Sequence, residues 1–136
     1  MADVAFWERM LVELYIVPAS RDRYLSFLKG RKHRKKLLDR LNHNLDIDQA
    51  VSVQIPASDR NAAALTDVLR RNHVSSTCFL MADGSAADGR ELRVELAIDE
   101  FLNNHWGAVL ICPPKPIVLY KEKDIGRLYL LGGHCA

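Results

Sequence analysis

The residue types best suited to chemistry lie in one loop and at the end of one apolar run. Asp83 and Asp88 stand in the stretch ADGSAADG, and Cys112 follows the run GAVLI. Two carboxylates can act as an acid and a base or hold Mg²⁺, and a cysteine becomes a nucleophile when a histidine such as His105 approaches it. A structural interpretation is also open, because Asp-Gly is a common turn and a cysteine at a strand end often packs as a small hydrophobe.

Two further positions have spacings that suit a site. Ser58 is expected to cap the N-terminus of a helix, where free backbone N–H groups can hold a phosphate or carboxylate. His43 is followed by Asp46 and Asp48, which allows either a catalytic His–Asp pair or a histidine that stabilises the negative end of a helix dipole. No Cys-x-x-Cys or His-x-x-x-His spacing occurs, and we therefore predict no metal site and no cofactor.

Charge is segregated along the chain. Residues 20–43 hold nine Lys or Arg against two Asp, whereas the remainder holds ten Lys or Arg against fifteen Asp or Glu, so the net charge of +2 conceals a local positive field. We predict that the cations within residues 31–40 bind a partner or anion: Arg31, Lys32, Arg34, Lys35, Lys36 and Arg40. Nucleic-acid phosphates, an acidic protein and the acidic remainder of a second copy all suit this surface. The alternative is that these cations form only a solvated helix face with no partner.

Any nucleic-acid binding by residues 31–40 is expected to be independent of base sequence. The segment has no interleaved aromatic residues to stack on single strands. It also lacks the short turn to a preceding helix that a helix-turn-helix reader of DNA needs. Arg34, Lys35 and Lys36 are expected to face water, so replacing them should leave the fold intact.

The hydrophobic pattern predicts a single α/β domain over residues 1–136. Residues 1–43 form a helical N-terminal part that includes the basic helix, and residues 50–131 follow in the order βαβαβββ. The predicted strands are 51–55, 74–81, 107–111, 117–120 and 127–131, which give a mixed, roughly five-stranded sheet. Strands that alternate with helices favour parallel crossovers, so the first three strands are expected to be mostly parallel.

Parallel strands would gather the candidate residues at one edge of the sheet. Ligands bind beyond the carboxyl ends of such strands, and this rule selects the loops that carry Ser58, the two aspartates and Cys112. A small enzyme built around Asp83, Asp88 and Cys112 is therefore one hypothesis.

The first predicted helix, residues 4–17, is apolar on more than one side. Phe6, Trp7, Met10 and Tyr15 cannot all face one small core if the helix packs on it from outside. This excess of apolar surface on the helix predicts a homodimer. The alternative is a helix wedged between the core and another segment of the same chain.

The cysteines bear on the compartment, and the charges near the N-terminus bear on membrane association. Cys78, Cys112 and Cys135 are an odd number without paired spacing, which favours reduced thiols in a cytoplasmic protein. We expect Cys78 and Cys112 to lie on neighbouring strands. Glu8, Arg9 and Glu13 interrupt the longest apolar stretch, so no membrane partner is expected.

Several stretches resemble the sequence patterns of an uncharacterised bacterial family of small α/β proteins. The matching stretches cover most of the chain: RKHRKKLLDRLNH at 31–43, TCF at 77–79, DGRELRVELAID at 88–99, WGAVLICPP at 106–114, and the aromatic positions Tyr120 and Tyr129. Where the family pattern ends a strand with Ser-Cys-x-Pro-Gly, this chain reads Ile-Cys-Pro-Pro-Lys at 111–115, which argues against a catalytic turn. The resemblance supports the α/β architecture and implies no known activity.

These observations favour a non-enzymatic protein that binds a partner through its basic helix. The small enzyme and sequence-independent nucleic-acid binding are the alternatives. A concave pocket that joins the candidate loops would indicate an enzyme, whereas an open basic face would indicate a binding module.

Overall fold

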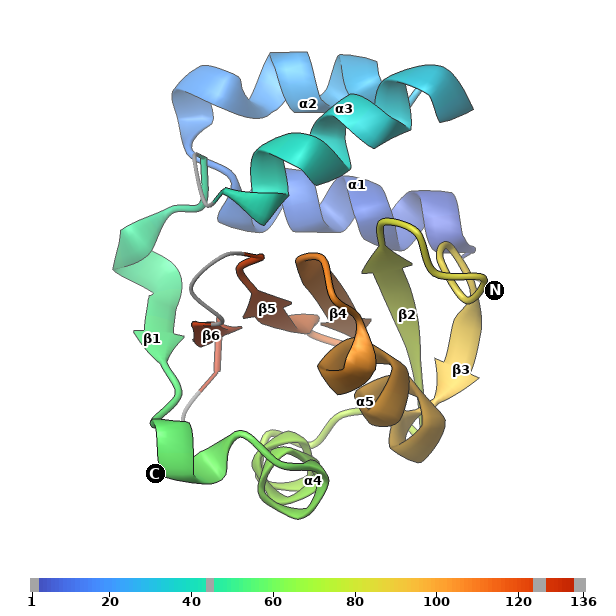
Figure 1. The fold of residues 1–136 in the computed structure, drawn as a ribbon. Coiled ribbons are helices and arrows are strands. Elements are labelled where there is room, and N and C mark those ends of the chain that lie inside the picture. Colours follow the sequence, from blue (N-terminus) through green and yellow to red (C-terminus); the bar gives the residue numbers. More distant parts are fainter. Residues whose placement is uncertain (1–2, 44–45, 124–126, 134–136) are drawn as a thin grey trace.

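The fold is a six-stranded sheet covered by helices on both faces (Figure 1). The computed structural model describes residues 3–43, 46–123 and 127–133. The helices are α1 (Val4–Tyr15), α2 (Arg21–Phe27), α3 (Arg31–Asn42), α4 (Ala62–Arg71) and α5 (Val94–Asn103). The strands are β1 (Ser52–Gln54), β2 (Thr77–Ala82), β3 (Glu91–Arg93), β4 (Ala108–Cys112), β5 (Ile117–Lys121) and β6 (Leu128–Leu131).

The sheet has the order β1-β6-β5-β4-β2-β3, and every neighbouring pair is antiparallel. The α/β class is thus confirmed, but the prediction of five strands with the first three parallel is wrong. The missed strand is β3, which pairs with β2 through the hairpin made by residues 83–90. Because β3 reverses the chain, α5 connects β3 to β4, and β2 lies between these two strands.

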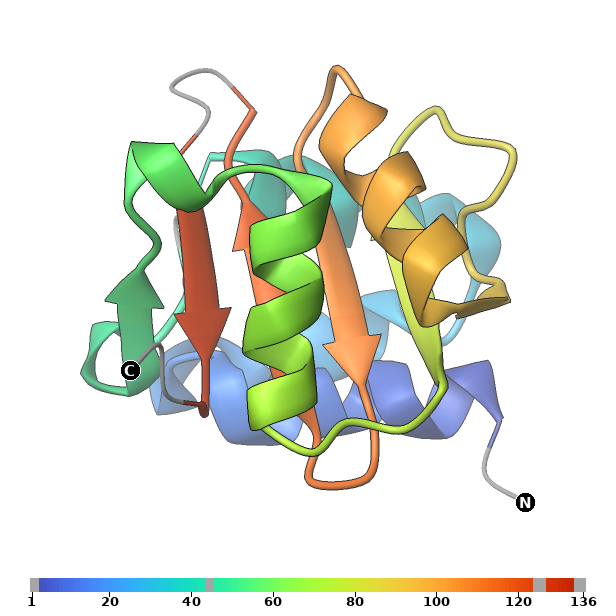
Figure 2. The same cartoon turned by 90° about the horizontal axis from the view of Figure 1, so that it is seen from below.

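Helices α1, α2 and α3 cover one face of the sheet, and α4 and α5 cover the other (Figures 1 and 2). Side chains alternate along the strands, as the pleat of a strand requires. Leu80, Leu110 and Leu119 point toward α4 and α5, whereas Phe79 and Val109 join the core beneath α1 and α3. Every residue of β4 is buried, which confirms the expectation from its unbroken apolar sequence.

Helix α1 lies between the sheet and α2 (Figure 1). Tyr15 is buried and donates a hydrogen bond to the Pro116 carbonyl oxygen over 2.5 Å. The Trp7 ring stacks on Phe79, with centroids 6.1 Å apart, and contacts Phe6 edge-on at 4.9 Å. The apolar circumference of α1 is therefore largely covered within one chain.

Helix α4 begins later than predicted. Asn61 is its N-cap, since the Asn61 side chain accepts a hydrogen bond from the Ala64 N–H over 2.9 Å. Ser58 belongs instead to a single 3-10 turn, Ala57–Asp59. The prediction that Ser58 caps this helix is wrong, because a second polar side chain three residues on supplies the cap.

Candidate functional site

Four of the predicted site residues line one surface hollow. Arg34 and Lys35 of α3 meet Asp83 and Asp88 of the Asp-Gly loop, which we define as residues 83–90. The hollow has a volume of about 450 Å³, and its other lining residues are Leu38, Ser85 and Gly89. The basic helix and the Asp-Gly loop, which the sequence predicts as separate sites, are therefore neighbours.

Arg34 links three parts of the fold. Its Nη1 donates to Asp88 Oδ2 over 2.6 Å, and its Nε and Nη2 donate to the Glu8 carboxylate on α1. Burial lowers the pKa of Arg34, but the two carboxylates more than compensate and raise it above its ordinary value. The side chain is only 16% exposed, so the expectation that Arg34 faces water is wrong. Position 34 lies three and four residues before Leu37 and Leu38, on the face of α3 that packs inward.

The two aspartates of the Asp-Gly loop have different roles. Asp88 Oδ1 accepts a hydrogen bond from the Ala82 N–H over 2.9 Å while Oδ2 receives Arg34, so both oxygens hold the loop in place. The Asp83 carboxylate has no hydrogen bond or ion pair to another described residue. Asp83 and Asp88 therefore do not form a pair of free carboxylates for acid–base chemistry.

Cys112 lies at the opposite end of the sheet from these aspartates. Strands β2 and β4 are antiparallel neighbours with Ala82 opposite Ala108, so the end of β4 meets the start of β2. This confirms that Cys78 and Cys112 lie on neighbouring strands, although the parallel crossover expected to place them there is absent. Cys112 instead lines a separate hollow of about 270 Å³ with residues that include His73 and Lys115.

Ser58 is remote from the other candidates. It follows β1, and three strands separate β1 from β2, a span of roughly 19 Å at the usual strand spacing. The predicted convergence of three strand-end loops is therefore wrong, because the sheet is antiparallel and β1 lies at its far edge.

Arg40 is committed to a second structural network. Its Nε donates to Asp46 Oδ2 over 2.8 Å, and the same carboxylate accepts hydrogen bonds from the Tyr24 hydroxyl over 2.5 Å and from Ser20 Oγ over 3.0 Å. Burial alone would raise the pKa of Asp46, but these donors lower it below its ordinary value. The network ties α2 to α3 and occupies the carboxylate of Asp46, one of the two aspartates suggested as a partner for His43.

The lysines of α3 are arranged differently from its arginines. Lys32, Lys35 and Lys36 are exposed, and none forms an ion pair with a described residue. Lys29 and Arg23, on the neighbouring segment, are also exposed. The side chain of Arg31, also predicted to bind, lies outside the described residues. We call the exposed cations at positions 23, 29, 32, 35 and 36 the lysine face.

Two residues near the hollow were missed by the sequence analysis. Glu8 occupies the buried stripe of α1 with Leu11 and Val12, and a carboxylate in such a stripe signals a buried cationic partner. Trp106 lies beside Gly84, and Lys123 Nζ is 3.8 Å from the centroid of its ring. No local pattern predicts the Trp106 contact, because it joins loops far apart in the sequence.

Two kinds of feature are absent from the described part of the chain. No three His, Cys, Asp or Glu side chains there are arranged to hold a metal ion. Within residues 3–43, 46–123 and 127–133, no helix has the length and apolar character needed to cross a membrane.

Comparison of the chain with protein-family models, with curated proteins and with solved structures found no match. The resemblance to an uncharacterised bacterial family therefore stays a prediction.

Proposed function

We propose that this protein is a non-enzymatic binding protein that engages an acidic protein partner through the lysine face. The main support for this proposal is that the arginines and the lysines of α3 have different surroundings. Arg34 and Arg40 are held by carboxylates of the same chain, whereas Lys32, Lys35 and Lys36 are exposed and have no carboxylate partner among the described residues. Exposed charges of one sign steer an oppositely charged partner and set its orientation.

An enzyme built on the predicted loops has less support. Such a site needs its reactive groups within reach of one substrate atom. Asp88 is occupied on both carboxylate oxygens, and Cys112 lies at the other end of the sheet. The structural interpretation of these residues, a turn and a buried strand end, accounts for the contacts they make.

An acidic protein suits the lysine face better than a nucleic acid does. Asp22 and Asp39 are exposed on the same two helices, and they would lie close to phosphates that follow the lysines. The described side chains of α2 and α3 include no largely exposed aromatic residue on which a base could stack. A protein partner can place its own cations opposite these aspartates.

The test compares two variants, each of which lacks three positive charges. The binding variant carries Lys32→Gln, Lys35→Gln and Lys36→Gln. The control variant carries Arg70→Gln, Arg71→Gln and Arg93→Gln, which remove equal charge from exposed positions on or beside the helices of the other face. Poly-L-glutamate is the acidic probe, and random-sequence duplex DNA and single-stranded RNA are the competing probes.

We expect poly-L-glutamate to bind the wild type and the control variant equally, and to bind the binding variant at least tenfold more weakly. Equal binding by both variants would show that net charge, not this face, attracts the probe. Tighter binding of duplex DNA or RNA than of poly-L-glutamate would overturn the choice of a protein partner.

We also propose that the protein is a homodimer and that it is located in the cytoplasm. A homodimer would give about twice the 15.4 kDa chain mass in light scattering. Because α1 is covered within the chain, the exposed Leu14, at 40% exposure, is the main apolar residue it offers to such a contact. A cytoplasmic location rests on the cysteine pattern alone.

A further inference from the structure

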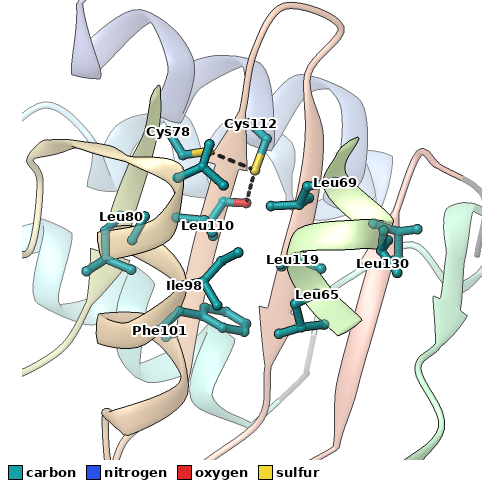
Figure 3. Packing of buried hydrophobic residues seen from close by; sticks show 14 of the residues in the cluster. Leu65, Leu69, Cys78, Leu80, Ile98, Phe101, Leu110, Cys112, Leu119 and Leu130 are labelled. Atoms are coloured by element: carbon teal, nitrogen blue, oxygen red, sulfur yellow. Dashed lines mark hydrogen bonds between the residues drawn. The ribbon is translucent and has the colours of Figure 1, made fainter. Parts of the chain in front are cut away.

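Cys78 and Cys112 face each other in the core between the sheet and the helices α4 and α5. Their sulfur atoms are 3.3 Å apart, and the Cys112 thiol also lies 3.8 Å from the Leu110 carbonyl oxygen (Figure 3). Both side chains are fully buried and are free cysteines. In Figure 3 the labelled residues around them include Leu69, Leu80 and Ile98, so the pair is enclosed by apolar groups.

The backbone already satisfies the requirements of a disulfide. The register pairs Phe79 with Ile111, so Cys78 and Cys112 are the next residues outward on the two strands. Directly opposite residues of antiparallel strands have Cα atoms about 4.5 to 5.5 Å apart, within the range of about 4.4 to 6.8 Å that disulfides span. Closure to a bond of about 2.05 Å needs side-chain rotation and no exchange of strand partners.

A surface hollow adjoins Cys112, whose side chain is fully buried. This hollow has a volume of about 270 Å³ and lies at the end of the sheet. It is lined by Cys112, Val74 and the segment 113–115, among other residues. Burial raises the pKa of the Cys112 thiol, which keeps it protonated and slow to react. The pair is thus stable as a dithiol and differs from the reactive, exposed thiols of redox enzymes.

We propose that Cys78 and Cys112 form a latent redox site that a small hydroperoxide converts to an intramolecular disulfide. Cys112 Sγ attacks the terminal hydroxyl oxygen of the hydroperoxide and forms a sulfenic acid as the O–O bond breaks. The thiol proton leaves with the alkoxide as an alcohol, or with hydroxide as water when hydrogen peroxide is the oxidant. Cys78 Sγ then attacks the resulting sulfenic sulfur, the S–O bond breaks, and hydroxide leaves with the Cys78 proton as water. Two thiols are oxidised and one peroxide is reduced.

The test uses the full chain with Cys135→Ser, so that only the two core thiols remain. Hydrogen peroxide under native conditions should reduce the thiol count, measured after denaturation, from two to zero. The intact mass should fall by two hydrogen atoms, and peptide mapping should join the peptides that contain residues 78 and 112. Loss of one thiol, gain of oxygen atoms at both cysteines, or disulfide-linked dimers would overturn the proposal.

Two further measurements separate this site from oxidation of an unfolded chain. Cys78→Ala and Cys78→Val, each checked for native circular dichroism, should stop at a Cys112 sulfenic acid, which dimedone labels once the oxidised chain is unfolded in urea. Oxidised glutathione is far bulkier than hydrogen peroxide and should react at least tenfold more slowly relative to its rate with the urea-unfolded chain. If both oxidants show the same native protection, the reaction proceeds through global unfolding and the proposal fails.

Discussion

Arg34 of α3 and Asp88 of the Asp-Gly loop form an ion pair in which Nη1 lies 2.6 Å from Oδ2. The same guanidinium binds Glu8, whose side chain is 7% exposed. One arginine therefore fixes the basic helix to α1 and to the hairpin between β2 and β3. Arg34, one of the cations predicted to bind a partner, thus contacts two carboxylates of its own chain.

We expect Arg34→Gln to lower the free energy of unfolding by about 3 kcal/mol, because removal of one member of a largely buried pair leaves Glu8 without its counter-charge. Lys35→Gln, at the next position, should change it by less than about 0.5 kcal/mol. Urea unfolding followed by tryptophan fluorescence measures both values. Equal effects of the two substitutions would contradict the different roles of these neighbours.

The two aspartates of the Asp-Gly loop should also differ. Asp88→Asn weakens the bond to Arg34, and we expect a loss of about 1 to 2 kcal/mol. Asp83→Asn should be close to neutral, because its carboxylate makes no described contact. Urea titrations measure the unfolding free energy of both variants. A larger loss of stability for Asp83→Asn than for Asp88→Asn would contradict the structural role given to Asp88.

The Asp46 network should make stability depend on pH. The folded state lowers the pKa of Asp46 below its ordinary value of 3.8. Its stabilisation is therefore fully present above that value and is lost as the pH falls through the lower folded-state pKa. Asp46→Asn should cost about 2 kcal/mol near neutral pH, less than a fully buried pair because Arg40 is partly exposed.

The measurement is the difference in unfolding free energy between the wild type and Asp46→Asn. Other carboxylates contribute equally to both proteins and cancel. The difference should shrink as the pH is lowered from neutral to below 3.8. A difference that stays constant over this range would mean that ionised Asp46 does not contribute to stability.

The thiols should be free in protein prepared under reducing conditions. Cys78 and Cys112 form no disulfide in the structure, and Cys135 lies outside the described residues. Thiol titration in denaturant without reductant should give three thiols per chain. A count of one would show that the core pair oxidises without added peroxide and is more reactive than its burial implies.

The parts of the fold that depend on local pattern could be predicted from the sequence. The buried stripe of α3 follows from the spacing of Leu37, Leu38 and Leu41, and the burial of β4 follows from its unbroken apolar run. The position of Arg34 on that stripe follows from the same spacing, but the dense positive charge of the segment hides it.

Other features depend on contacts that no local pattern encodes. Strand β3 contains one leucine between two charged residues, and only pairing with β2 makes it a strand. Without β3, the order of the elements predicts parallel strands, which would bring Cys112 to the same edge of the sheet as the aspartates. The approach of the Asp-Gly loop to α3, and of Trp106 to Gly84, likewise arises from tertiary packing.

The salt dependence of binding tests the central claim most directly. If Lys32, Lys35 and Lys36 alone contact a duplex DNA probe, the slope of log K against log salt should be about −2.7, and affinity should fall roughly 40-fold between about 50 and 200 mM salt. Poly-L-glutamate binding should weaken in the same direction. A slope of about −4.5 would mean that Arg23 and Lys29, the other two cations of the lysine face, also contact the duplex. Absence of any binding of poly-L-glutamate or nucleic acid at about 50 mM salt would contradict the account and leave the lysines as a solvated surface.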